Sequence, residues 1–429
     1  MRDLPDRFWE RVRVAIPQAD VPVVQVPESL RRPRLDVSRR QVLAVGGAAV
    51  VALLVLALRL AVAQAGAAVL PWFVPWWSDG NRPPVTQRIA AGRSHTCAVT
   101  THGTVKCWGD NVWGQLGDGT TRASATPVEV QDLAGVVALS GSGNHTCALT
   151  AAGLVFCWGA DDSGQLGDGG SAARSVPVRV AAVGEGVRAI SGSATHTCAL
   201  LRSRAVSCWG DNGAGQLGAG TSPSGTGPRE VVGLPPRSTA VSAGNGYTCV
   251  VFTGRTVRCW GDNGDGQLGV GDTEPRSSWQ PVVGLPWASA VSAGDTHSCA
   301  VTHDGRVMCW GANDGGQLGI IKAARNALTP MAVPGIGEDY ELVAAGYRRT
   351  CAVSRAGEVT CWGGSADDNA EVVPTIMAEL PPSQDVAVGA FHACALAGTE
   401  VWCWGRNPDG QLGDGTVRDH AQPVRVANF

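Results

Sequence analysis

From residue 85 to the C-terminus, the sequence has no uninterrupted stretch with the apolar pattern of a helix. This absence excludes a helical fold for most of the chain. The motifs of common catalysts are also missing: there is no Gly-x-Ser-x-Gly, no phosphate loop and no His-Glu-x-x-His. No Ser-His-Asp set stands out either. The sequence therefore predicts no catalytic residue and no cofactor, and we expect a protein that is not an enzyme.

Basic residues are also fewer than acidic residues after residue 59. Residues 1–59 hold ten Arg against six acidic residues, whereas the whole chain has a net charge of −3. The remainder therefore carries about −7. A mildly acidic surface binds nucleic acid poorly, so we expect no nucleic-acid partner.

What the sequence does contain is one segment repeated seven times. The first copy, HTCAVTTHGTVKCWGDNVWGQLGDGT, starts at His95. The others start at His145, His196, Tyr247, His297, Arg349 and His392. Successive leading cysteines are 50, 51, 51, 50, 52 and 43 residues apart. A fixed period of this length is typical of repeat architectures.

Each repeat reads as short strands. In the second copy, 127–130, 136–142, 147–150 and 155–158 are rich in Val, Ala and Leu and are bounded by Gly or Pro. Four such strands in about 50 residues form one antiparallel sheet, which has two apolar faces and cannot stand alone. Radial stacking covers both faces. The sequence therefore predicts an all-β fold, a seven-bladed β-propeller over residues 85–429.

The last strand suggests how the ring closes. Most repeats begin with a Pro-Val strand, and the chain ends with a spare one at 423–426. The first repeat has only a weak version at 84–85. We expect the C-terminal strand to complete the first blade, which would leave no open sheet edge.

The strings H-T-C-A-L and C-W-G-x-N-x-x-G-Q-L-G resemble the repeats of the regulator of chromosome condensation family. Six of the seven copies keep Gly-Gln-Leu-Gly; the sixth reads GSADDNAEVVPTIMAEL after Trp362 and is predicted to lack part of its outer loop. The resemblance implies a seven-bladed propeller, here of the exported bacterial type. Exported members of the family include bacterial proteins that grip an extracellular enzyme with one propeller face, so inhibition of such an enzyme is one form that binding could take. Nuclear members bind chromatin and act on a small GTPase, but these repeats leave no room for an exchange wedge.

The cysteines recur in pairs. All 14 fall in the repeats: Cys97 and Cys107, Cys147 and Cys157, Cys198 and Cys208, Cys249 and Cys259, Cys299 and Cys309, Cys351 and Cys361, and Cys394 and Cys403. Around a hairpin turn this spacing sets the two residues opposite each other, about 4.5–5.5 Å apart, which is within reach of a disulfide. We expect one disulfide in each blade. The alternative is buried free thiols, which are good core residues. No Cys-x-x-Cys occurs, so zinc is not expected.

Other recurring residues are interpreted as structural. The residue two before each leading cysteine is His in five copies, but neighbouring blades lie about 10 Å apart, too far to share a metal. We expect these side chains to bond a neighbouring backbone, and we predict no metal site. The recurring Trp should pack between blades, and Gly-Gln-Leu-Gly should form a turn that sends its Leu into the core. Acidic turns such as 161–162 and 262–265 lack the calcium-loop pattern.

The N-terminal region has three predicted parts: a basic tail (1–40), an apolar segment (41–63) and a linker (64–84). The arginines that precede the apolar segment favour a cytoplasmic N-terminus. The segment is either a retained transmembrane helix, for which about 20 apolar residues suffice, or a twin-arginine signal around Arg39 and Arg40, cleaved after 61–63. Either places the propeller outside the cytoplasm, membrane-anchored or secreted.

We therefore expect an exported or membrane-anchored propeller, monomeric, that binds a protein or a surface polymer. Binding should use the loops that differ between copies: 221–228, 273–279, 322–334 and 365–375. Exposed Trp113, Trp279 and Trp287 are candidate anchors for the partner. Two alternatives are a hydrolase or lyase acting on envelope polymers, and an intracellular regulator similar to a guanine nucleotide exchange factor. Clustered carboxylates would favour the first, and free thiols the second.

Overall fold

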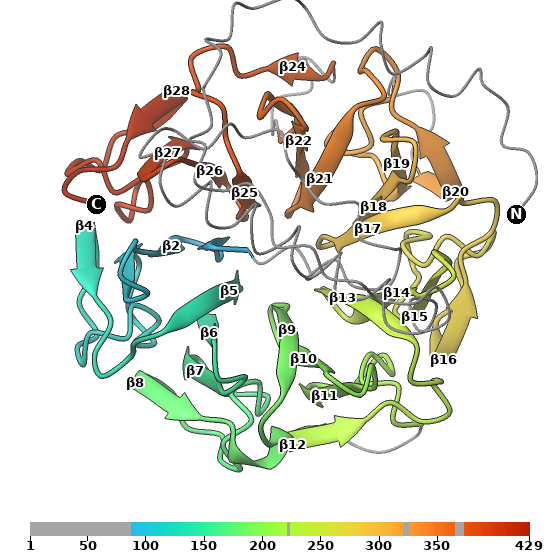
Figure 1. The fold of residues 1–429 in the computed structure, drawn as a ribbon, viewed down its shortest axis with the longest axis horizontal. Coiled ribbons are helices and arrows are strands. Elements are labelled where there is room, and N and C mark those ends of the chain that lie inside the picture. Colours follow the sequence, from blue (N-terminus) through green and yellow to red (C-terminus); the bar gives the residue numbers. More distant parts are fainter. Residues whose placement is uncertain (1–86, 221–223, 321–325, 365–372) are drawn as a thin grey trace, which may run out of the picture. The chain divides into compact units, whose positions relative to one another are not determined.

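The computed structural model describes residues 87–220, 224–320, 326–364 and 373–429. There the chain forms seven antiparallel sheets of four strands each, arranged around a common axis (Figure 1). The predicted all-β, seven-bladed propeller is confirmed. The tail (1–40), the apolar segment (41–63) and the linker (64–84) lie outside the described residues. Within the described ranges, no helix is long and apolar enough to cross a membrane.

Each blade is built from consecutive strands. Blade 1 contains β1 (Ile89–Ala91), β2 (His95–Val99), β3 (Val105–Gly109) and β4 (Ser124–Glu129). Blade 2 contains β5 (Val136–Ser142), β6 (His145–Thr150), β7 (Val155–Gly159) and β8 (Arg174–Arg179), and the short 3₁₀-helix η2 (Ala181–Val183) follows. Blade 3 contains β9 (Val187–Gly192), β10 (His196–Leu201), β11 (Val206–Gly210) and β12 (Gly225–Glu230). Blade 4 contains β13 (Ser238–Gly244), β14 (Tyr247–Phe252), β15 (Val257–Gly261) and β16 (Arg276–Pro281). Blade 5 contains β17 (Ala288–Ala293), β18 (His297–Thr302), β19 (Val307–Ala312) and β20 (Asn326–Ala332). Blade 6 contains β21 (Tyr340–Ala345), β22 (Arg349–Ser354), β23 (Val359–Gly363) and β24 (Thr375–Ile376), and blade 7 contains β25 (Asp385–Val388), β26 (His392–Ala397), β27 (Glu400–Gly405) and β28 (His420–Arg425).

Two faces follow from this order. The first strand of each blade lies nearest the axis and the fourth lies at the rim (Figure 1). We call the face that carries the turns between first and second strands the AB face; these turns are 92–94, 143–144, 193–195, 245–246, 294–296, 346–348 and 389–391. The opposite face, the BC face, carries the turns between second and third strands: 100–104, 151–154, 202–205, 253–256, 303–306, 355–358 and 398–399.

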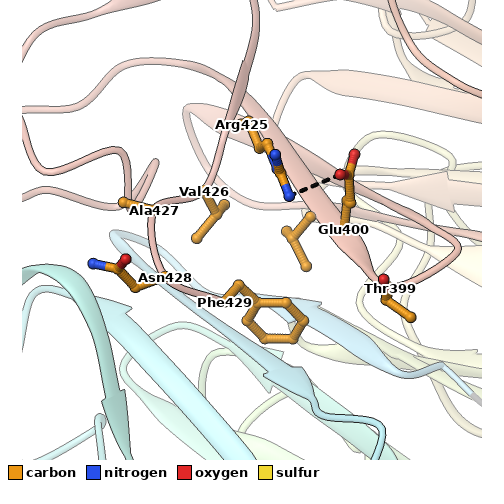
Figure 2. Close-up of a pocket in the computed structure, with 8 residues that line it drawn as sticks. Thr399, Glu400, Arg425, Val426, Ala427, Asn428 and Phe429 are labelled. Carbon is orange, nitrogen blue, oxygen red and sulfur yellow. Dashed lines mark ion pairs between the residues drawn. The ribbon is translucent and has the colours of Figure 1, made fainter.

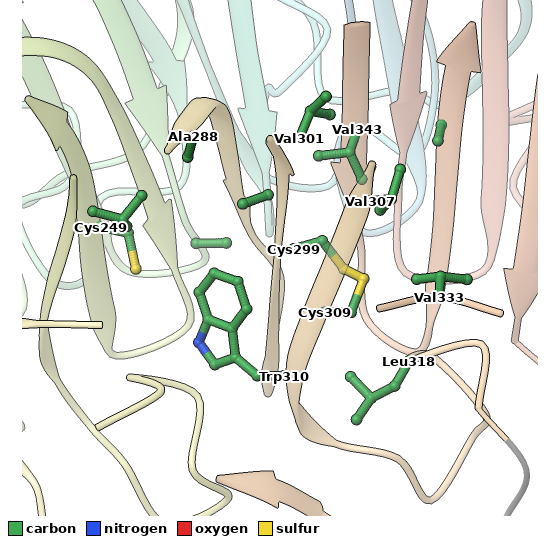
Figure 3. Packing of buried hydrophobic residues seen from close by; sticks show 14 of the residues in the cluster. Cys249, Ala288, Cys299, Val301, Val307, Cys309, Trp310, Leu318, Val333 and Val343 are labelled. Carbon is green, nitrogen blue, oxygen red and sulfur yellow. A yellow bond between two sulfur atoms is a disulfide. The ribbon is translucent and has the colours of Figure 1, made fainter. Parts of the chain in front are cut away.

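A disulfide joins the two middle strands of every blade. In blade 1, Cys97 of β2 and Cys107 of β3 are paired residues of the ladder, with Cα atoms 4.1 Å apart. The same bond recurs in the other six blades, and no cysteine is left free. In Figure 3 the Cys299–Cys309 bond lies among Val301, Val307 and Trp310 in the core of blade 5. The predicted pairing is therefore confirmed, and free thiols are excluded.

The blades are joined by one recurring contact. The indole N–H of Trp158 in blade 2 donates to the carbonyl oxygen of Gln115 in the Gly-Gln-Leu-Gly turn of blade 1, at 2.8 Å. The equivalent bonds reach Trp108, Trp209, Trp260, Trp310 and Trp362 at 2.8–2.9 Å. Leu116, the Leu of the same turn, is fully buried between the blades. The predicted roles of Trp and Leu are confirmed.

The expected ring closure was wrong. The C-terminal strand β28 pairs with β27 in blade 7, through Cys403 opposite Val424, and not with the first blade. In the same way Val128 pairs with Cys107 of its own blade. The Pro-Val strand therefore follows the cysteine hairpin to which it belongs, and the seven units fill seven blades with no strand exchanged. Because blades stack face to face, closing the ring needs no strand pairing.

Side-chain contacts join blades 7 and 1 instead. Trp108 donates its indole N–H to the Gln411 carbonyl at 2.9 Å. The last residue, Phe429, packs edge-on against Trp108 with ring centroids 6.0 Å apart. Lys106 Nζ donates to the Asn428 carbonyl at 2.9 Å. The C-terminal tail thus reaches the first blade, but by side chains rather than by a ladder.

Candidate protein-binding face

The ring of histidines is structural. His95, His145, His196, His297 and His392 are all buried, at most 1% exposed. His95 Nε2 lies 2.8 Å from the Thr146 hydroxyl of the next blade. The same contact joins the other four to Thr197, Thr248, Thr350 and Thr96 at 2.8–3.0 Å. The expected backbone partner was wrong: the partner is a threonine side chain in the neighbouring blade.

The bonding pattern fixes the protonation of these rings. The Thr96 hydroxyl donates to the Gln411 carbonyl at 2.9 Å, so it has only its lone pairs left for His392. His392 must then carry its proton on Nε2. Its Nδ1 has no hydrogen-bond partner among the described residues. A second proton would therefore be buried without an acceptor, and burial lowers the pKa of His392 to about 3.

The interface between blades 6 and 7 departs from this pattern. Arg349 stands at the histidine position, and Ala393 stands where five other blades have Thr and blade 5 has Ser. The Gly-Gln-Leu-Gly turn is also missing from blade 6, and its outer strand β24 has only two residues against six or seven elsewhere. Burial lowers the pKa of the Arg349 guanidinium. At the interface between blades 6 and 7, the histidine, the threonine and the Gly-Gln-Leu-Gly turn that join other neighbouring blades are therefore all replaced or missing.

Aromatic and arginine side chains gather on the AB face directly above this interface. Tyr347 and Phe391 precede Arg349 and His392 and are each 38% exposed, with ring centroids 5.9 Å apart. The Arg348 guanidinium lies over the Tyr347 ring at 5.4 Å, and that of Arg406 over the Phe391 ring at 5.5 Å. We call these four residues the aromatic–arginine cluster. The turns of the other five blades hold only small or polar residues and Arg93 at this level.

Acidic groups flank the cluster on the same face. Asp314 of blade 5 pairs with Arg348 at 2.7 Å. Burial raises the pKa of Asp295, against the opposing effects of a hydrogen bond from Asn245 and the charges of Arg93 and Arg348. Arg93, Asn245, Asp295 and Arg348 come from the AB turns of blades 1, 4, 5 and 6, whereas Asp314 lies in the loop after β19 of blade 5. The AB face thus offers exposed aromatic surface beside both signs of charge.

Carboxylates elsewhere on this face are occupied by turn bonds. Asp110 Oδ2 accepts from Gln115 Nε2 at 2.9 Å, and Asp262 Oδ2 accepts from Gln267 Nε2 at 2.9 Å. Gln115 Oε1 in turn accepts from the Trp113 backbone N–H at 2.9 Å, so the Gln amide holds the turn. Among the described residues, no three His, Cys, Asp or Glu side chains come together as a metal site would need.

Comparison with known proteins identifies the family. The RCC1-like domain matches residues 66–372, and the regulator of chromosome condensation (RCC1) repeat matches residues 384–411 and 400–429. The chain belongs to the RCC1-like domain family.

Individual relatives agree with this assignment. The ultraviolet-B receptor UVR8 of Arabidopsis thaliana is 29% identical over 352 residues, which cover 79% of this chain and 69% of the receptor. The secretion-regulating guanine nucleotide exchange factor of Mus musculus is 31% identical, but the match covers only 49% of this chain and 50% of that protein.

Among solved structures, Prp20p of Saccharomyces cerevisiae superimposes with a TM-score of 0.69 at 21% identity, covering 77% of this chain and 87% of Prp20p. Human WBSCR16 gives a TM-score of 0.67 at 20% identity, covering 76% and 94%. These structures share the fold of this RCC1-like domain.

The three predicted tryptophan anchors do not come together in this RCC1-like domain. Trp113 lies in the loop after β3 on the AB side, 38% exposed, and Trp287 lies on the BC face, 67% exposed. Trp279 is not fully exposed as expected. It is partly buried in the outer strand β16, with the Arg258 guanidinium 4.5 Å from its ring. Residues 221–223, 322–325 and 365–372 of the predicted binding loops lie outside the described residues.

Sequence reasoning missed Tyr347 and Phe391. The available signal was their position, one or two residues before the ring residue, where no other blade has an aromatic side chain. The pairing itself was not visible, since 44 residues separate the two and only the stacking of blades 6 and 7 brings them together.

A shallow pocket of about 400 Å³ lies where blade 7 meets the C-terminal tail (Figure 2). Its polar groups are used internally: Arg425 pairs with Glu400 at 2.8 Å. Phe429 forms one wall and also packs on Trp108. The pocket is therefore part of the ring closure, and we assign it no ligand.

Proposed function

We propose that this RCC1-like domain works outside the cytoplasm as a scaffold that binds a protein through the AB face. The observation that carries the proposal is the aromatic–arginine cluster. Tyr, Trp and Arg dominate the energetics of protein interfaces. Here Tyr347, Phe391, Arg348 and Arg406 are exposed or partly exposed, at positions where the other blades have no exposed aromatic side chain.

The location is supported by the sulfur chemistry. Seven disulfides persist in oxidising compartments and are rare in the cytosol. The apolar segment 41–63 supplies an export route, either as a retained membrane anchor or as a cleaved signal. We favour the anchor, with the propeller displayed on the outer side.

A folded protein is the partner that best fits the AB face. The face combines aromatic surface, arginines and acidic groups within one patch, which suits a mixed protein surface better than a uniformly charged polymer. Yeast Prp20p, which has the same fold, binds Gsp1p and histones. A propeller of this kind can therefore serve as a protein-binding module.

The test uses the full chain in its own cells. A photo-reactive amino acid at position 391 should crosslink one defined protein, and the adduct should disappear when Tyr347→Ala and Arg406→Glu are introduced. The same amino acid at Thr399 on the BC face, and a Val176→Ala variant that trims an exposed apolar residue in the rim strand β8 of blade 2, are the controls. Equal adducts from positions 391 and 399, or adducts unaffected by the two substitutions, would contradict the proposed face.

Location is measured separately. With impermeant thiol reagents and protease added to intact cells, the propeller should be cleaved from outside and should show no free thiol before reduction. Free thiols together with protection from protease would contradict export.

A further inference from the structure

The BC face carries arginines at strained backbone positions in blades 3 and 4. In six blades the last but one residue of the turn between second and third strands has a left-handed backbone. Four of them use glycine there: Gly103, Gly153, Gly305 and Gly357, with φ from 76° to 88°. Blades 3 and 4 instead have Arg204 and Arg255, at φ 68° and 59°.

Arginine is a poor residue for this conformation. A side chain with a Cβ is disfavoured at positive φ, whereas glycine is not. The chain forms the same turn with glycine four times, so folding does not require arginine at the other two positions. Strained residues that persist in a fold are found at functional positions more often than elsewhere. The arginine side chains themselves are therefore the feature to explain.

The two strained arginines belong to one continuous patch. The Ser238 N–H donates to the Arg204 carbonyl, which puts the loop containing exposed Arg237 beside the blade 3 turn. The Thr253 N–H donates to the Arg237 carbonyl at 2.9 Å, which joins that loop to the blade 4 turn and Arg255. Exposed Arg202 completes the series in the blade 3 turn.

Exposed apolar side chains border these arginines. The Ala288 N–H donates to the Arg255 carbonyl, and the preceding residue, Trp287, is 67% exposed. Val232 and Val283, in the two loops that flank blade 4, are 66% and 50% exposed. No acidic residue occurs in the segments 202–205, 232–238, 253–256 or 283–287.

We propose that this Arg–Trp patch (Arg202, Arg204, Arg237, Arg255, Trp287, Val232 and Val283) docks on the surface of an anionic phospholipid bilayer. Guanidinium groups bind phosphate oxygens in pairs of hydrogen bonds. Tryptophan and aliphatic side chains enter the interfacial region beside the headgroups. Basic residues close to an anionic surface are attracted to it over about a Debye length.

The point at which the chain enters the propeller also supports docking of this face on a membrane. The first strand enters blade 1 at the BC face, since the Arg88 guanidinium donates to the carbonyl of Thr100 in the blade 1 turn at 3.2 Å. The chain therefore enters the propeller on the side that bears the patch. The inference rests on the proposed function in this respect: with segment 41–63 as a membrane anchor, the entry point and the patch share one side of the propeller, so the patch is free to approach the bilayer.

The experiment measures docking of the patch with a fluorescent probe on the propeller, so that it does not depend on whether the chain is anchored in the membrane. The full chain, reconstituted in vesicles, carries one added cysteine labelled with a fluorophore; the disulfides leave no other thiol. The cysteine replaces exposed Thr253 in the patch or exposed Val112 on the AB side. Vesicles contain phosphatidylcholine alone or with about one-third phosphatidylglycerol, plus a headgroup-labelled quencher lipid.

We expect the probe at 253 to be quenched only in the anionic vesicles, and less at high salt, while the probe at 112 is not. Arg202→Gln with Arg237→Gln should reduce the docked fraction about tenfold or more. Trp287→Ser should also reduce it. Arg122→Gln with Arg418→Gln, which removes the same charge from exposed loops elsewhere, should leave it unchanged.

Equal quenching of both probes, or quenching insensitive to phosphatidylglycerol and to the Arg202 and Arg237 substitutions, would overturn the docking. So would protection of position 253 by added acidic protein but not by vesicles, which would assign the patch to a protein. Anchoring is read independently, from whether the chain resists alkaline extraction. Loss of the anchor with docking retained would contradict the tether and leave the patch intact.

Discussion

The carboxylate of Asp385 in blade 7 accepts a hydrogen bond from the backbone N–H of Arg88, 297 residues earlier in the chain, at 2.6 Å. The same oxygen accepts the N–H of Ile89 at 3.2 Å, and the other oxygen accepts that of Val386 at 2.9 Å. Asp385 is buried. One side chain therefore ties the first strand of the propeller to the last blade, where the sequence had suggested a shared strand.

Asp385→Ala should weaken the ring at this point. It removes the acceptor of three backbone N–H groups, two of them at the start of the first strand. Leaving buried donors unpaired costs about 1–3 kcal/mol, so we expect a loss of roughly 3 kcal/mol in the free energy of unfolding. Urea unfolding followed by tryptophan fluorescence measures it. Glu379→Ala removes an exposed acid nearby and should leave the midpoint unchanged; equal midpoints for the two variants would contradict the role of Asp385.

Replacing Asp161 by Asn is expected to stabilise the protein. Five other blades have Asn at its position: Asn111, Asn212, Asn263, Asn313 and Asn407. In each case the residue accepts the N–H of the buried Leu, and in blade 1 the Asn111 amide also donates to the Arg122 carbonyl at 3.0 Å. Asp161 accepts the Leu166 N–H with one oxygen, and its other oxygen is buried with no partner among the described residues.

The pH dependence of that site follows from its pKa. Burial raises the pKa of Asp161 from 3.8 to about 6, because the charged carboxylate loses its hydration there. A raised pKa means that stability is lost as pH rises through the window from 3.8 to 6. Asp161→Asn should therefore stabilise the protein by about 1–2 kcal/mol at pH 8 and by less at pH 4. Asn263→Asp should do the reverse. A gain that does not change with pH would contradict the titration of Asp161.

The buried histidines should make the propeller sensitive to acid. Burial lowers the pKa of His95, His196, His297 and His392 to about 3 and that of His145 to about 4, from 6.5. The stability they contribute is complete above pH 6.5 and is lost as pH falls from 6.5 towards 3–4, at most about 1.4 kcal/mol per pH unit for each residue.

Burial raises the pKa values of Asp385 and Asp161 to about 7 and about 6. Over part of the same pH range, protonation of these two groups therefore increases the stability of the folded protein as pH falls. The five histidines outweigh the two aspartates, so the denaturant midpoint of unfolding should decrease as the pH is lowered from 6.5 to 5. The double variant His95→Tyr, Thr146→Ser should reduce this decrease in the midpoint, because the chain already has a Tyr–Ser pair between blades 4 and 5. There Tyr247 donates to the His297 carbonyl at 2.6 Å and lies 3.0 Å from Ser298. His303→Asn, at an exposed histidine, is the control. A midpoint flat from pH 7 to pH 5 would contradict buried neutral histidines.

Blade 6 should be the first to lose its disulfide. Cys361 is 8% exposed, whereas every other cysteine is fully buried. Reduction requires access to sulfur, so mild reductant should open Cys351–Cys361 before the rest. Alkylation and peptide mass spectrometry would give the order. In a second measurement, Cys147→Ser with Cys157→Ser should cost about 2–3 kcal/mol, as expected for a loop this short. Simultaneous reduction of all seven bonds would contradict a distinct blade 6.

The single blade follows from local patterns in the sequence. The repeat period, the paired cysteines around a short turn and the recurring Trp and Gly-Gln-Leu-Gly are all contained within one repeat. A hairpin brings cysteines ten residues apart into register without help from the rest of the fold. For the same reason the disulfides and the buried Leu are predictable from the sequence alone.

Contacts that cross from blade to blade depend on the assembled ring. These contacts all join residues of different repeats. They are the bond from each ring histidine to a threonine, the bonds of Asp385 to the start of the first strand, the contact of the Tyr347 and Phe391 rings, and the series of arginines over blades 3 and 4. The repeat period also did not determine whether each Pro-Val strand belongs to the blade before it or to the blade after it, because both assignments give the same spacing. The physical reason is that a sheet fixes register within one blade, whereas the angle and depth at which two blades pack are set by side chains that no single repeat contains.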